Sequence, residues 1–158
     1  MNIDSLKEAF GKFTTGVTVV ATHNVEVGNI GFTANSFSSV SLEPPLLLVC
    51  MGKQVSSFDA FENAEHFTIS ILNEEQADVA MIFATSPEDR FAQVKWEKDN
   101  NGQPLISNAS AHFSCRQFDK KMAGDHLILI GEILSCSVNE APGLAYGGKS
   151  FLTTSPVK

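Results

Sequence analysis

Short runs of apolar and β-branched residues, separated by clusters of Gly, Pro, Asn and Asp, recur along the chain and predict a protein built mainly of strands. Val17–His23 is rich in β-branched residues, and a polar turn at 24–28 leads to a second strand from about Ile30, which predicts a hairpin. Leu46–Met51 is continuously apolar and predicts a strand buried on both faces. Gly131 lies in the longest run and predicts a bulge or the close approach of another backbone. The remaining runs predict strands over 66–72, 111–118, 125–138 and 151–153.

Apolar residues at helical spacing predict short helices between these strands. Near the N-terminus, Leu6, Phe10 and Phe13 fall on one face of a helix, and we expect this face to pack on the body of the domain. Asn2 or Asp4 would cap that helix. Other helices are predicted over 57–65 and 74–85, and one is predicted to start within 87–91. Six or seven strands with interspersed short helices favour a closed or partly closed antiparallel barrel over a parallel α/β sheet, within one domain spanning 1–158.

Composition narrows the classes of partner. The chain has 158 residues with 11 basic and 18 acidic side chains, a net charge of −7, which argues against nucleic acid or an anionic membrane as the main partner. This charge does not exclude a cofactor that carries phosphate. Cys50, Cys115 and Cys136 are odd in number and form no Cys-x-x-Cys pair, so we expect buried, reduced thiols rather than disulfides or a structural metal. No window reaches the apolar length of a membrane span, and a cytoplasmic location is expected.

The most informative segment is Thr33–Ser41, which lies between two apolar runs and contains neither a charge nor a glycine. Its short hydroxyl and amide side chains suit the edges of a flat, uncharged heterocycle with several carbonyls and ring nitrogens. A flavin ring fits that description. The alternative is a sheet edge that happens to be rich in Ser and Thr.

A second candidate site is an anion site at Lys53-Gln-Val-Ser-Ser57. A cation and two hydroxyls precede a predicted helix there, so Lys53, Ser56 and Ser57 could hold a phosphate; the alternative is a solvated Lys and an ordinary Ser N-cap. Arg90 could contact the phosphate or a dinucleotide, or it could form a salt bridge with Glu88 or Asp89.

The segment Gly31–Cys50, together with Gly124-Asp125-His126 at the start of a long strand, resembles the short-chain flavin reductase family over nearly the whole chain. The resemblance implies an FMN-binding split β-barrel, antiparallel and Greek-key-like, that forms a homodimer. It also implies an NAD(P)H:flavin oxidoreductase that uses NADH or NADPH to reduce FMN or FAD and supplies reduced flavin to a partner monooxygenase. An FMN-binding electron carrier or storage protein of the same fold is the alternative.

The same resemblance assigns the residues around the flavin. It implies that Tyr146 lies beside the cofactor, although this tyrosine could instead cover the end of the barrel, because the segment 141–146 lacks the Pro-Leu that many relatives have before the aromatic residue. The residues placed along the ribityl chain and ring edge are Thr33, Ala34, Asn35 and Ser36, and those beside the isoalloxazine are Ser39, Val40 and Ser41.

His126 is the candidate catalytic residue, because the resemblance places its imidazole where it can position the nicotinamide. Hydride passes from nicotinamide to flavin, so the protein mainly sets distance, orientation and water exclusion. Asp125 is expected to orient the turn or the imidazole. A purely structural histidine is the alternative. The other histidines show no metal-ligand spacing, and no metal is expected.

Overall fold

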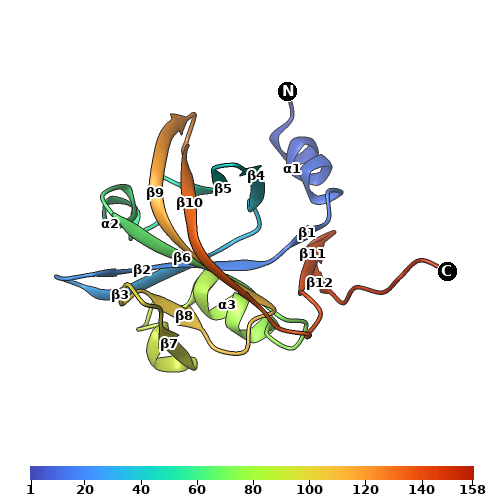
Figure 1. Ribbon diagram of the computed structural model, residues 1–158. Helices are drawn as coiled ribbons and strands as arrows, with labels where there is room; N and C mark the ends of the chain where they lie inside the picture. The colour runs from blue at the N-terminus through green and yellow to red at the C-terminus, as the bar shows by residue number, and fades with distance from the viewer.

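The computed structural model describes residues 1–158 and consists mainly of antiparallel strands with a few short helices (Figure 1). A seven-stranded sheet has the order β3-β2-β6-β9-β10-β5-β4, and two small sheets flank it, in the orders β1-β11-β12 and β7-β8. The predicted fold class is therefore confirmed. The helices are α1 (Ile3–Gly11), α2 (Phe58–Glu62), α3 (Ala77–Thr85) and the 3₁₀ helix η1 (Phe91–Gln93). The strands are β1 (Thr15–Gly16), β2 (Thr18–Asn24), β3 (Gly28–Ala34), β4 (Ser38–Leu42), β5 (Pro45–Gly52), β6 (His66–Ile71), β7 (Trp96–Lys98), β8 (Pro104–Ile106), β9 (Ala111–Ala123), β10 (His126–Val138), β11 (Ala145–Gly147) and β12 (Ser150–Leu152).

Three hairpins build the main sheet, and one of them, β2–β3, was predicted as a hairpin. β2 pairs with β3 along its whole length, with Thr18 opposite Ala34 at one end and Asn24 opposite Gly28 at the other, as the turn at 24–28 indicated. β9 and β10 form a long hairpin that extends beyond the rest of the barrel (Figure 1). β4 and β5 form the third hairpin, with a cis peptide bond before Pro44 in the connection. The sheet thus begins and ends with the edge strands β3 and β4.

Ser36 closes the barrel between the two ends of this sheet. β4 pairs with β5 only as far as Leu48, so the backbone of Cys50 has no strand on that side. The Ser36 hydroxyl accepts from the Cys50 N–H at 2.8 Å and donates to the Cys50 carbonyl at 3.1 Å. One side chain thereby satisfies the backbone groups that a further strand residue would otherwise satisfy.

Two hydrophobic cores lie on opposite sides of β2. One fills the barrel with side chains that include Val20, Phe32, Val49 and Phe67. The other lies between the sheet, α3 and the segment that follows it, and includes Val19 and Phe83. Successive residues of β2 therefore enter different cores, which explains why this strand is apolar almost throughout.

The bulge predicted at Gly131 is confirmed, but its close neighbours are side chains and not another backbone. The pairing of β10 with β9 shifts register between Ile130 and Gly131, which marks the bulge. A Cβ at Gly131 would lie 2.6 Å from the ring of Phe67 and 3.0 Å from the Cβ of Cys115, so only glycine fits against the buried ring without a shift.

Four expectations about the body of the fold are wrong in part. Helix α1 is capped by Asn2, whose side chain accepts from the Asp4 N–H at 2.8 Å, but it buries no residue and stands apart from the barrel, with Phe10 70% exposed (Figure 1). Strand β5 alternates between buried and half-buried positions instead of being buried on both faces. The short helix predicted to start within 87–91 is only the 3₁₀ turn η1, which starts at Phe91, the last of these positions. The cysteines are half-buried, buried and exposed in turn at Cys50, Cys115 and Cys136.

None of the helices combines the length and apolar character that a membrane-crossing helix requires.

Candidate functional site

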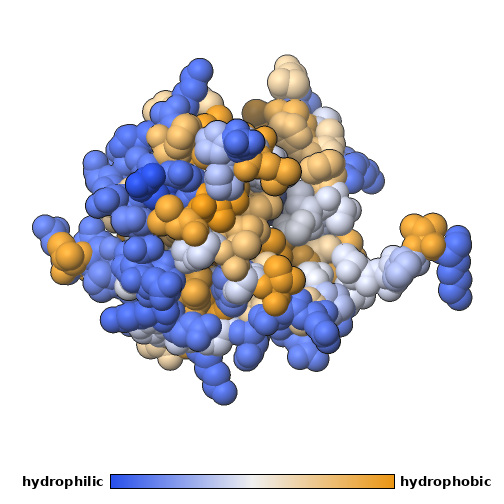
Figure 2. Space-filling model, in the orientation of Figure 1, coloured by the Kyte–Doolittle hydropathy of each residue, from blue (hydrophilic) through white to orange (hydrophobic).

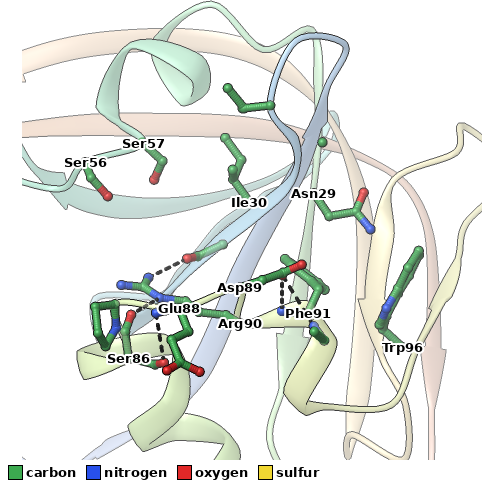
Figure 3. A pocket seen from close by; sticks show the side chains of 15 residues that line it. Asn29, Ile30, Ser56, Ser57, Ser86, Glu88, Asp89, Arg90, Phe91 and Trp96 are labelled. Carbon is green, nitrogen blue, oxygen red and sulfur yellow. Dashed lines mark hydrogen bonds between the residues drawn. The ribbon is translucent and has the colours of Figure 1, made fainter.

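A cavity of about 630 Å³ brings together three of the residues predicted to bind phosphate: Ser56, Ser57 and Arg90 (Figure 3). The two serines come from the loop between β5 and α2, and Arg90 comes from the loop between α3 and η1. These segments are more than thirty positions apart in the sequence, and β3 runs between them in the fold (Figure 3). Parts of two separate candidate patterns therefore meet in one cavity.

Arg90 is held in place by backbone carbonyls and not by an acidic side chain. Its Nε donates to the Ser86 carbonyl at 3.0 Å and its Nη1 to the Gly31 carbonyl at 2.9 Å. The ion pair with Glu88 or Asp89 that was considered as an alternative is absent. A guanidinium has five N–H donors, so the fixed Arg90 keeps donors free for an anion in the cavity.

The two serine hydroxyls are also free, because neither makes a hydrogen bond within the chain. Ser57 occupies the N-cap position of α2, but its side chain makes no capping bond, which contradicts the reading of an ordinary Ser N-cap. Helix α2 has only five residues, so the helix dipole invoked from the sequence adds little. Two hydroxyls and a guanidinium with spare donors form a donor set that fits a phosphate.

Lys53 lies away from this cavity and next to the predicted catalytic histidine. The Lys53 N–H donates to the Asp125 carbonyl at 3.0 Å, and the Lys53 side chain contributes to the electrostatics of the Asp125 carboxylate. The predicted phosphate-binding set of Lys53, Ser56 and Ser57 is therefore divided between two places.

His126 opens β10 and faces the end of β5. Its Nδ1 lies 2.7 Å from the Asp125 Oδ1, so the carboxylate orients the imidazole as expected. The pKa of the Asp125 carboxyl lies below its usual range, mainly because His126 donates a hydrogen bond to it. The positive charge of His126 and, to a smaller extent, that of Lys53 lower this pKa further. A Cβ at Gly52 would lie 3.6 Å from the His126 Nε2, so the absence of a side chain at Gly52 leaves that edge of the ring open. The His126 side chain is 50% exposed, which leaves it accessible to a ligand.

The hydroxyls of Thr33 and Ser36 bind distant parts of the chain. Thr33 donates to the Ala80 carbonyl of α3 at 2.6 Å, and Ser36 holds Cys50 as described above. Ala34 is buried in the barrel core. Side chains that reach a flavin from these positions would have to share or exchange these bonds, which the sequence did not indicate.

The rest of the segment is more open. Asn35 is exposed, as are Ser39 and Val40 on the edge strand β4. The Ser41 hydroxyl accepts from the Glu43 N–H at 3.2 Å. None of these residues lines the cavity that holds Arg90, so the structure does not bring the ring-binding and phosphate-binding predictions into one pocket.

Tyr146 is half-buried on β11, where its ring packs against Phe151 with a centroid distance of 5.3 Å. Its side chain adjoins the second core and does not line the cavity of Arg90. This placement favours the alternative in which the tyrosine covers one end of the barrel.

Three residues that line the cavity escaped the sequence analysis: Asn29, Phe91 and Trp96. Asn29 lies near the start of β3, directly after the predicted turn at 24–28, and Phe91 resembles the eleven other phenylalanines of the chain. Trp96 is the single tryptophan, which was the one available signal.

An open antiparallel barrel with a phosphate-sized donor set and an accessible His–Asp pair defines the class of flavin- and nucleotide-binding split barrels. Within that class, the chain belongs to the family described as flavin reductase like domain, which matches residues 10–155.

Curated relatives carry related names. The chain is 48% identical over 151 residues to the reductase component of a flavin-dependent trigonelline monooxygenase of Acinetobacter baylyi, covering 96% of this chain and 49% of that protein. It is 43% identical to a stachydrine N-demethylase reductase subunit of Rhizobium meliloti, covering 96% of this chain and 66% of that protein. It is 41% identical to the FMN reductase (NADH) SmoA of Agrobacterium fabrum, covering 95% and 85%. The chain thus spans about half the length of the first of these relatives and about two-thirds of the second.

Solved structures share the fold. The NADH:FAD oxidoreductase SgcE6 of Streptomyces globisporus, in complex with NAD and FAD fragments, superposes with a TM-score of 0.92 at 37% identity, covering 97% of this chain and 93% of that chain. The flavin reductase PheA2 superposes with a TM-score of 0.89 at 32% identity, covering 99% and 100%.

Proposed function

We propose that the protein is an NAD(P)H:flavin oxidoreductase that transfers hydride from a reduced nicotinamide to FMN or FAD. The observation that carries the proposal is the cavity in which Ser56, Ser57 and Arg90 present unused donors, within a fold shared with flavin reductases. In this proposal the donors bind the flavin phosphate, and the neighbouring segment Thr33–Ser41 lies along the ribityl chain and the ring.

Bound flavin supplies the hydride acceptor, and the residues of the chain position the reactants. His126 is proposed to hold the pyridine nucleotide over the flavin through its exposed ring edge, while Asp125 keeps the imidazole in one orientation. No proton has to leave carbon in hydride transfer, so the histidine acts through distance and alignment. Loss of its ring should therefore slow turnover and leave flavin binding intact.

The test is NADH and NADPH oxidation at 340 nm, with and without FMN or FAD, compared with His126→Ala. The expected result is flavin-dependent oxidation by the wild type and slower oxidation by the variant at unchanged flavin affinity. His66→Ala is the matched control, because His66 begins β6 and lies outside both the cavity of Arg90 and the His126–Asp125 pair, so the rate should stay unchanged. Oxidation that does not need added or bound flavin would contradict the proposal.

The same test separates the alternative inferred from the sequence, an FMN-binding carrier or store. A carrier would bind flavin and oxidise neither nucleotide. The accessible His126–Asp125 pair, which a carrier does not need, favours the reductase.

We also propose that the protein works as a homodimer. Phe10 on helix α1 and Phe13 just after it are at least 70% exposed, and Leu42 on strand β4 is 95% exposed. Figure 2 shows apolar side chains gathered on this face of the molecule. Exposed apolar surface of this kind is typical of a subunit contact, and a second copy is the partner that symmetry favours. Light scattering after size exclusion should give twice the chain mass, and Phe10→Ser with Phe13→Ser should shift it toward the monomer; a monomeric wild type would refute the dimer.

A separate monooxygenase is the proposed acceptor of the reduced flavin, in keeping with the name of the relative from Acinetobacter baylyi. The cytoplasmic location stays a prediction.

A further inference from the structure

The cavity of Arg90 extends beyond what a single flavin phosphate needs. Its donors, Ser56, Ser57 and Arg90, lie on one side in Figure 3, and Asn29 and Trp96 lie on the other. Asp89 is placed between the two groups in the same view. An FMN whose phosphate binds at the serines would end there, which leaves the side of Trp96 without a ligand group.

That second side has the chemistry of a nucleoside site. Trp96 is only partly buried, and its ring is fixed edge-to-face against Phe91, with a centroid distance of 5.8 Å and an interplanar angle of 81°. A fixed, partly exposed indole is a good surface for stacking a purine, because every base has a π-face.

Asn29 adds a directed hydrogen-bond donor. Its Oδ1 lies 2.8 Å from the His23 Nδ1, and this contact orients the amide. The amide N–H₂ makes no hydrogen bond in the chain, so it can donate to a ring nitrogen of the base. In this respect Asn29 resembles Arg90, since both side chains are held by one set of contacts and keep donors for another.

The carboxylate of Asp89 completes the order of groups along the cavity. Its Oδ1 accepts from the Phe91 N–H at 3.0 Å, which anchors the side chain and leaves the second carboxylate oxygen as a free acceptor. A carboxylate between a phosphate site and a base site is suited to accept hydrogen bonds from ribose hydroxyls. The same negative charge would repel a phosphate at that position.

We propose that this side of the cavity binds the adenosine of a dinucleotide flavin, so that FAD is the preferred flavin and Trp96 and Asn29 determine that preference. The proposal rests on the proposed function, because it assumes that the flavin phosphate binds at Ser56, Ser57 and Arg90. The pyrophosphate would lie at these donors, the ribose at Asp89, and the adenine on Trp96 beside the Asn29 amide. NADH also carries an adenosine phosphate, and the test separates this second source.

The experiment measures FAD and FMN affinity by isothermal titration calorimetry on the full chain. The wild type should bind FAD about tenfold more tightly than FMN, which is the scale of one base stacked on an aromatic side chain. Trp96→Ala and Asn29→Ala should remove most of that difference while FMN affinity changes less than about twofold. Trp96→Phe keeps an aromatic face and should retain most of the preference for FAD. Glu97→Ala is the matched control, because Glu97 is exposed on the same strand and does not line the cavity.

A second readout does not depend on the variants folding well. Trp96 is the single tryptophan, so its fluorescence reports this cavity directly. AMP should quench or shift the emission of the wild type, and FAD should displace the AMP whereas FMN displaces it less completely.

Several results would overturn the inference. FAD binding no tighter than FMN, or equal losses of both flavins in Trp96→Ala, would refute the adenosine site and leave the reductase proposal standing. Trp96→Ala that raises the KM for NADH and spares FAD would assign the cavity to the pyridine nucleotide instead. Failure of the wild type to bind either flavin would refute the proposed function itself.

Discussion

Removal of the two free serine hydroxyls should weaken flavin binding without lowering the stability of the protein. Ser56 and Ser57 line the cavity of Arg90, and their side-chain hydroxyls make no hydrogen bond within the chain. Replacement of either by alanine therefore removes a donor to the phosphate and nothing that the folded chain uses. This separation of binding from folding makes Ser57→Ala, alone and with Ser56→Ala, a direct test of the phosphate site.

The expected magnitude follows from the chemistry of the acceptor. A hydrogen bond to a charged group contributes roughly 1.5–3 kcal/mol. Ser56 is exposed and Ser57 is half-buried, so water competes for both and the lower figure of about 1.5 kcal/mol applies to each. Since about 1.4 kcal/mol corresponds to a tenfold change in Kd, we expect roughly tenfold weaker binding for Ser57→Ala. The double variant should approach about 100-fold, less any coupling between the adjacent hydroxyls.

The assay pairs calorimetric titration of flavin with urea unfolding of the flavin-free protein. Ser70→Ala is the matched control with the opposite expectation. Ser70 is buried and its hydroxyl accepts from the Ile106 N–H at 3.0 Å, so its loss leaves a buried donor unpaired. We expect that control to lose about 1–3 kcal/mol of unfolding free energy and no flavin affinity. Wild-type affinity in the double serine variant, or a loss of stability in it as large as that of Ser70→Ala, would refute the reasoning.

Three further predictions concern packing, orientation and thiol reactivity. Gly131→Ala places a Cβ 2.6 Å from the buried ring of Phe67, and this overpacking should cost about 2 kcal/mol and lower Tm by roughly 4–8 °C, measured by calorimetry; Gly16→Ala, with open space around it, should change little. Asp125→Asn removes the charged partner of His126 and should slow NADH oxidation on the order of tenfold at unchanged flavin affinity. Because the pKa of the Asp125 carboxyl is lowered, this group stays charged from pH 5 to 8. Any stability that the charge contributes is lost only as the pH falls through that lowered pKa. A urea midpoint that changes between pH 8 and pH 5 in the wild type but not in Asp125→Asn would contradict this assignment. Burial raises the pKa of the Cys115 thiol to about 12, so a thiol reagent at pH 8 should label exposed Cys136 quickly and Cys115 only after unfolding; rapid labelling of all three cysteines would show that the barrel core opens.

The strands were predictable where the local pattern is strong. The run 125–138 became β10 almost residue for residue, and Gly131 became its bulge, because a long apolar run and an interior glycine each have a direct local cause. Whether an apolar face is buried against another part of the protein has no such local cause. The apolar face of α1 and the outer face of β5 were both expected to be buried, but periodicity shows only which side is apolar and not what lies against it.

The same limit explains the predictions about the site. Ser56, Ser57 and Arg90 were each recognised as donors, but only the fold shows that they share a cavity. The hydroxyls of Thr33 and Ser36 looked free in the sequence, yet their partners Ala80 and Cys50 lie 47 and 14 positions away. Hydrogen bonds over such separations depend on tertiary structure, and no local motif reveals them.

The hydrogen bond from Arg90 to Gly31 has a consequence for how the protein behaves in a crowded solution. β3 is an edge strand, and an unpaired carbonyl on such an edge can accept the N–H of a strand from another molecule. The Arg90 guanidinium occupies the Gly31 carbonyl and places a charged side chain against the middle of β3. Intermolecular sheet extension at this edge would have to displace that side chain first, so the contact that shapes the cavity also protects the protein against aggregation.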